Sequence, residues 1–158
     1  MPAHLNRHPL HPPFTHFPIA FWISAVVLDL LLSAEWLSAI PGIDGFALPH
    51  LLLWSGVAMA LPAVAAGLID YAKLPSSIQG SRVLQRHVLS MASAFVLFLC
   101  AAIWRVKSGA FAAEPAIGIV VLELVAAIAL VVGGYLASRV VFELLPGEST
   151  GTRDGGSV

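Results

Sequence analysis

Residues 116–143 read AIGIVVLELVAAIALVVGGYLASRVVFE, and between Ala116 and Ser138 the only charged residue is Glu123. A helix of about 20 apolar residues is long enough to cross the hydrocarbon core of a bilayer. Three further apolar stretches of similar length precede this one. The sequence therefore predicts an all-α integral membrane protein with four membrane-spanning helices, at about residues 15–37, 48–70, 82–105 and 116–143.

The composition supports this prediction. Of the 158 residues, 58% are hydrophobic and 11% are charged, whereas about 25% of the residues of a soluble domain are charged. Such a chain has too little charge to cover a surface that faces water. The net charge of -1 also argues against a nucleic-acid partner, because nucleic acid requires a basic face. With Cys100 as its single cysteine, the chain lacks the motif that attaches c-type haem.

Short connections with proline, glycine and serine separate the four stretches. Short connections join antiparallel neighbours, so we expect an up-down-up-down four-helix bundle that forms one domain over residues 1–145. We expect the first helix to have Thr15 as its N-cap and Pro18 in its first turn, where a missing amide is tolerated. Residues 146–158 are rich in glycine, serine and threonine, and we expect a disordered tail there.

Basic residues are distributed unequally between the two ends of the expected bundle. Arg105 and Lys107 lie at one end, and the other six lie on the side shared by the termini and the second connection: Arg7, Lys73, Arg82, Arg86, Arg139 and Arg153. Cytoplasmic segments of membrane proteins carry the excess of Lys and Arg, so we expect both termini in the cytoplasm. We expect Arg105 and Lys107, at a helix end, to reach the lipid headgroups by snorkelling.

The same topology brings polar residues from three helices to one depth, at the end of the bundle that holds the termini. These residues are His11, His16, Asp70, Arg86 and His87. Ionisable residues inside the membrane boundary are usually paired, bound to a ligand or functional. Two interpretations stay open: the residues form one shared site, or they lie separately among the lipid headgroups.

His16 and His87 are suitably placed to bind a haem. In a square up-down bundle the first and third helices are diagonal and parallel, so imidazoles at matching depth can bind one flat macrocycle from opposite faces. That is an arrangement of b-type haem in helical bundles. We therefore expect His16 and His87 to be the metal ligands of one haem b, with His11 and Asp70 orienting an imidazole or a propionate.

Small residues near the same depth would leave room for the macrocycle, and cations there would pair with its propionates. The small residues are Gly67, Gly133 and Gly134, and the cations are Lys73, Arg82, Arg86 and Arg139. Each set also has a simpler interpretation. Glycines in membrane helices commonly serve close helix packing, and the positive-inside rule alone would place arginines at this end.

Further polar residues lie toward the other end of the bundle. Asp29 comes 13 residues after His16, about 20 Å along a helix, and points to a different face. We expect it to form a separate feature, a pair with a neighbouring helix or with a partner subunit. Glu123 faces the bundle or is protonated, and Glu35 is expected to be solvated. His50 is the one histidine on this side, so we expect no second haem.

Four segments together resemble a known family. The opening HPLHPPFTHFPIAFW, from His8 to Trp22, resembles the signature of a small bacterial membrane family, the domain-of-unknown-function family 2231. AAGLIDY at 65–71, His87 at the head of the third helix and VGGYL at 132–136 fit the same family, and the resemblance covers nearly all of the chain except the tail. It implies a four-helix domain in the bacterial inner membrane. Relatives are sometimes joined to Rieske-type or cytochrome domains, which implies electron transfer.

The function expected from these observations is that of a membrane electron-transfer subunit with one haem b between the first and third helices and no enzyme activity of its own. Its expected partners are the lipid bilayer and another membrane redox subunit or a quinone. One alternative is a non-haem iron, copper or zinc centre with His11, His16, Asp70 and His87 as ligands. The other is a structural or assembly subunit of a larger membrane complex, without a cofactor. The sequence does not separate these three.

Overall fold

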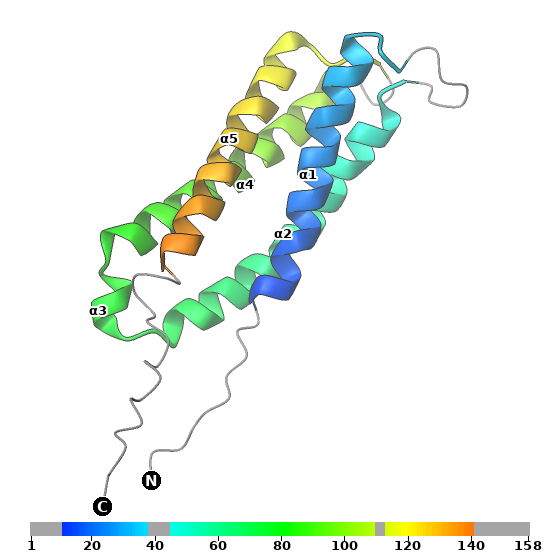
Figure 1. Ribbon diagram of the computed structural model, residues 1–158. Helices are drawn as coiled ribbons and strands as arrows, with labels where there is room; N and C mark the ends of the chain where they lie inside the picture. The colour runs from blue at the N-terminus through cyan, green and yellow to red at the C-terminus, as the bar shows by residue number, and fades with distance from the viewer. Residues whose placement is uncertain (1–10, 38–44, 110–112, 141–158) are drawn as a thin grey trace, which may run out of the picture.

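The computed structural model describes residues 11–37, 45–109 and 113–140, with side chains from residue 14 onwards. Within these ranges the regular structure is helical (Figure 1). The helices are α1 (His11–Ser33), α2 (Ala47–Ala72), the short α3 (Ser76–Gln79), α4 (Arg82–Lys107) and α5 (Ile117–Arg139). The prediction of four long apolar helices is confirmed. The predicted tail at 146–158 lies outside the described residues.

Each of the four long helices is long and apolar enough to cross a membrane. Their outer faces carry large exposed hydrophobic side chains, such as Leu68, Ile128 and Val131. A contiguous apolar surface of this kind is unfavourable in water and is the normal surface of a helix in hydrocarbon. The chain is therefore a multi-pass membrane protein, and lipid is the partner of its outer surface.

The bundle consists of two antiparallel hairpins. α1 packs along α2 and α4 packs along α5, while the hairpins meet through α2 with α4 and through α1 with α5. α1 and α4 therefore lie on a diagonal of the bundle, as the short connections predicted. Figure 1 shows that α1 begins and α5 ends at the end of the bundle that also holds α3. We call this the α3 end, and we call the opposite end, where α1 finishes and α5 begins, the far end.

Trp22 of α1 joins three helices in the core. Its buried indole stacks on Phe98 of α4, with ring centroids 4.7 Å apart and planes 11° apart. The indole Nε1 donates a hydrogen bond of 3.3 Å to the Leu53 carbonyl of α2. Beside it α2 carries Gly56, where any side chain would collide with the indole. In lipid such close packing, rather than exclusion of water, is what holds helices together.

α1 begins at His11, about one turn before the predicted start. Thr15 and Pro18 therefore lie inside the helix, and the prediction of Thr15 as N-cap is wrong. Prolines 12 and 13 occupy the first turn, where the backbone amides have no intrahelical partner and proline is tolerated. Because proline is tolerated throughout the first turn, the prolines do not indicate the residue at which the helix begins.

α1 also ends earlier than predicted, at Ser33, because the chain reverses into a left-handed conformation at Glu35, with φ of 60°. The Glu35 amide donates to the Leu32 carbonyl, and the Trp36 amide donates to the Leu31 carbonyl, both at 3.0 Å. This pair of bonds is the Schellman pattern that closes helix C-termini. Glycine usually occupies the left-handed position, so a glutamate there gives no sequence signal for the end of the helix.

Candidate functional site

The strongest contact among the predicted site residues is made by His87, near the beginning of α4. Its half-buried imidazole Nδ1 lies 2.8 Å from the backbone carbonyl oxygen of Gly133 on α5. A carbonyl oxygen can only accept a hydrogen bond, so Nδ1 carries a proton, and in the neutral ring the lone pair is then on Nε2. One turn along, the Ser90 hydroxyl donates to the Ala129 carbonyl at 2.8 Å. These two bonds fix α4 against α5 and fix the tautomer of His87.

The predicted glycines have different surroundings. The space beside Gly133 is filled by Met91, whose sulfur would collide with any side chain at that position. Gly133 therefore serves close packing of α5 on α4, which is the simpler of the two interpretations. A side chain at Gly134, by contrast, would meet no atom within 4 Å, and Gly67 of α2 is partly exposed. Gly134 is exposed, so the open space beside it lies on the outer surface of α5.

His16 and Arg86 are exposed. On α1 the buried residues Trp22, Ala25 and Asp29 lie along one stripe, and at 100° per residue His16 is roughly 120° away from Trp22. His16 thus lies on the other side of α1 from the packed core. The side chain of His11 is outside the described residues.

Asp70, at the end of α2, is partly buried and lies 3.7 Å from Lys73 Nζ, three residues further on. A local pair of this kind in contact with water contributes little to stability. Among the described residues no three His, Cys, Asp or Glu side chains gather as they would around a metal ion. His16, Asp70 and His87 therefore share an end of the bundle but do not form a cluster in this structure.

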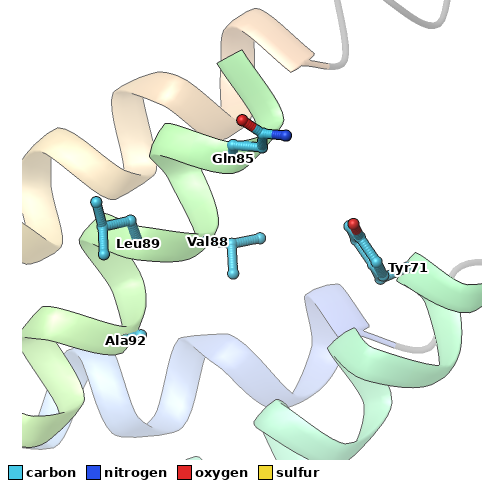
Figure 2. A pocket seen from close by; sticks show the side chains of 5 residues that line it. All are labelled: Tyr71, Gln85, Val88, Leu89 and Ala92. Carbon is cyan, nitrogen blue, oxygen red and sulfur yellow. The ribbon is translucent and has the colours of Figure 1, made fainter. Parts of the chain in front are cut away.

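An open groove runs between α2 and α4 near His87. It has a volume of about 290 Å³ and is lined by Tyr71 of α2 and by Gln85, Val88, Leu89 and Ala92 of α4. Figure 2 shows Tyr71 projecting from α2 across the groove from Gln85 and Val88. The volume lies at the lower limit for sites that bind small molecules. The groove gives the α3 end an opening between the two hairpins.

A second polar site, which the sequence did not predict as a unit, lies at the far end. Arg105 of α4 has no exposed surface, and its guanidinium binds the Asp29 carboxylate of α1 through Nη1 at 2.6 Å and Nη2 at 2.9 Å. Nη2 also donates to the Phe46 carbonyl at 3.2 Å, and the Phe46 ring lies 5.9 Å from the guanidinium carbon. The prediction that Arg105 snorkels to the headgroups is wrong, because Asp29 holds it inside.

Two more ionisable side chains complete this site. Glu123 of α5 is fully buried, with one carboxyl oxygen 3.8 Å from Nη1 of Arg105. His50 of α2 is 3% exposed and interacts electrostatically with Arg105 and Asp29. Asp29, His50, Arg105 and Glu123, one from each long helix, are called the far-end cluster below. His50 was noted in the sequence as the one histidine on this side, and its place beside Arg105 and Asp29 was not predicted.

The sequence contained part of the signal for this cluster. Asp29 follows the buried Trp22 and Ala25 at helical spacing, so it lies on the same face of α1. Glu123 lies on the same face of α5 as the buried Ala126 and Leu130. An ionisable residue in phase with a buried apolar stripe is expected to face the bundle interior and to be paired. The periodicity of each helix thus predicts which residues point inward.

No curated protein and no solved structure shows significant similarity to the chain. The model of one family, described as a predicted membrane protein family, DUF2231, matches residues 7–147. The match extends over all four long helices, both the α3 end with His87 and the far-end cluster, and agrees with the resemblance found in the sequence. The chain therefore belongs to the DUF2231 family of membrane proteins.

Proposed function

We propose that this protein is an electron-transfer subunit of the bacterial inner membrane that holds one b-type haem at the α3 end. The observation that carries the proposal is the 2.8 Å contact between His87 Nδ1 and the Gly133 carbonyl. Histidines that bind metals usually donate their second ring N–H to a carbonyl or carboxylate, which orients the ring and raises its basicity. His87 has this arrangement with Nε2 left to coordinate iron.

In this proposal His16 of α1, the helix diagonal to α4, would be the second residue to hold the haem iron. His16 is exposed, so in this proposal the beginning of α1 would have to turn for His16 to face His87. His11 and Asp70 orient an imidazole or a propionate, and the exposed Arg86 is available to a propionate. When bound, the haem iron supplies a one-electron couple.

Room for a macrocycle is the main demand on the α3 end. The groove beside Tyr71 supports the proposal, whereas the Met91 side chain beside Gly133 does not. The open space at Gly134 lies on the exposed outer face of α5 and provides no room between helices. A non-haem iron, copper or zinc centre is less well supported. It would need His16, Asp70 and His87 to converge with His11, and the described members of that set do not form a group.

A structural or assembly subunit without a cofactor is the second candidate, and the Asp29–Arg105 pair favours it. Two charge-assisted bonds between α1 and α4 fix the two hairpins against each other inside a membrane. Such a rigid module suits a protein that organises partner subunits. In that case the His87–Gly133 bond serves helix packing alone.

The proposals are separated by the visible spectrum of the full chain, purified in mild detergent from bacteria supplied with iron and a haem precursor. We expect a red protein whose bands sharpen on reduction as in six-coordinate b-type haem, and whose haem is extracted by acid acetone. His87→Ala should lose this spectrum, whereas Ile103→Ala, at an exposed position of the same helix outside the groove, should keep it. A colourless protein without bound metal would exclude both cofactor models and favour the structural subunit.

In the proposed arrangement the α3 end faces the cytoplasm, as the distribution of basic residues predicts. Electrons would pass between this haem and another membrane redox subunit or a quinone. The protein itself transforms no substrate in this proposal.

A further inference from the structure

We propose that the far-end cluster is a proton-binding site within the membrane, and that the carboxyl group of Glu123 is the group that takes up and releases the proton. This site is independent of the proposed haem, which lies at the α3 end. It is built from the four long helices, which each contribute one ionisable side chain. All four side chains are buried: Asp29, His50, Arg105 and Glu123.

The arrangement of hydrogen bonds distinguishes the two carboxyl groups. Asp29 receives both bonds of the Arg105 guanidinium, at 2.6 and 2.9 Å, a bidentate geometry that matches an ionised carboxylate. Glu123 lies 3.8 Å from Nη1, beyond hydrogen-bond distance. Within the part of the chain that the structure describes, no N–H or O–H donor of another residue reaches either carboxyl oxygen of Glu123, and its carboxyl neighbour is Asp29. Asp29 is therefore the ionised partner of Arg105, and Glu123 is the second carboxyl group.

Charge balance then determines the state of Glu123. One guanidinium neutralises one carboxylate, and Asp29 already occupies that role. A second carboxylate in a fully buried site would be an uncompensated charge, which a buried group avoids by binding a proton. Glu123 is therefore a neutral carboxylic acid whenever Arg105 is bound to Asp29.

Release of the proton has a defined consequence. The O–H bond of Glu123 breaks, the proton leaves to water at the far end, and the new carboxylate competes with Asp29 for Arg105. The charged groups that act on Glu123 are Asp29 on α1 and Arg105 on α4, and the titratable His50 on α2 interacts with both of these. The Asp29 charge opposes ionisation of Glu123 and the Arg105 charge favours it, so the site couples proton release to the position of the guanidinium.

The test is infrared difference spectroscopy of the full chain in lipid nanodiscs as the pH is raised from neutral. We expect a carbonyl stretch of a protonated carboxylic acid, sensitive to deuterium exchange, that disappears as the pH rises. Glu123→Gln should lose this band. Asp29→Asn should also lose it, because Arg105 then binds Glu123 as a carboxylate. Glu35→Gln, at an exposed acid outside the cluster, should leave it unchanged.

Glu123→Asp covers the case in which the glutamine variant fails to fold, because it keeps a carboxyl group and should shift the band. Circular dichroism and gel filtration establish that each variant is folded. Absence of a carboxylic acid band from the native protein would overturn the proposal, as would a band that stays unchanged in both Glu123 variants. A band that survives in Asp29→Asn would show that Glu123 does not exchange its proton for Arg105.

Discussion

Arg105 on α4 and Asp29 on α1 are joined by two hydrogen bonds across the diagonal of the bundle, with no exposed surface on either side chain. α1 and α4 are not adjacent helices, so this pair connects the two hairpins directly. Burying two charges carries a large desolvation cost, which a bidentate pair offsets only when its geometry is good. The pair therefore fixes the register between hairpins, and losing one partner has a greater effect than losing both.

We predict that Arg105→Ala destabilises the protein by about 3–5 kcal/mol, the usual effect of removing one partner from a buried ion pair. Asp29→Asn should cost less, about 1–3 kcal/mol, because Glu123, 3.8 Å from Nη1, can replace the lost carboxylate. Unfolding in mixed detergent micelles, followed by circular dichroism, measures both. Glu35→Gln is the control and should change stability by less than about 0.5 kcal/mol. Equal stability of Arg105→Ala and the native protein would show that the pair is not a constraint on the fold.

A double replacement separates the net contribution of the ion pair to stability from the cost of leaving one buried charge unpaired. Asp29→Leu together with Arg105→Met should be more stable than Arg105→Ala, since buried ion pairs can often be exchanged for apolar residues at little cost. The same unfolding assay gives the comparison. If the double variant is the less stable of the two, the cluster contributes more to stability than charge balance alone explains.

We predict opposite effects for two glycine substitutions. Gly56→Ala should destabilise the protein by about 1–3 kcal/mol, because the new methyl group collides with the Trp22 indole. Gly134→Ala should be neutral or stabilising by up to about 1 kcal/mol, because its new methyl group meets open space. Thermal unfolding in detergent compares the two. A Gly56→Ala protein as stable as the native one would contradict the packing of α1 on α2 through Trp22.

The orientation of the bundle is tested with a reporter enzyme that is active only outside the cytoplasm. Fused after Val158, the reporter should be inactive, and inserted at Asp44 it should be active, because basic residues are concentrated at the end that holds the termini. Activity in the first fusion and none in the second would place the α3 end outside the cytoplasm. The far-end cluster would then face the cytoplasm.

The fold could be predicted because each membrane-spanning helix corresponds to a continuous run of about 20 apolar residues in the sequence. The residues at which α1 begins and ends could not be predicted in this way. Prolines 12 and 13 look like a break but fit a first turn, and Glu35 takes a left-handed conformation that its side chain gives no reason to expect. Whether a helix forms is determined by many residues, whereas the position of its end is determined by one or two.

The far-end cluster was only partly predictable, for a geometric reason. Helical periodicity shows that Asp29 and Glu123 face inward. The pairing of Asp29 with Arg105 also depends on the position of α4 along the bundle relative to α1. Contacts such as the stacking of Trp22 on Phe98 contribute to that register together with the ion pair, and they join residues far apart in the sequence. At the α3 end, His16 was predicted to lie near His87 because the two residues have a similar depth in the membrane. A similar depth does not determine the face of α1 on which His16 lies.

The central claim, that His87 binds a haem through Nε2, is tested most directly by titrating the haem-free full chain in detergent with haem. We predict saturation at one haem per chain with a low-spin spectrum, loss of that spectrum in His87→Ala and in His16→Ala, and normal binding in Ile103→Ala, a variant outside the groove. His11→Ala should weaken binding by about 10- to 100-fold, as is usual for a group that orients a ligand. Titration curves for His87→Ala that match those of the native chain would contradict the claim.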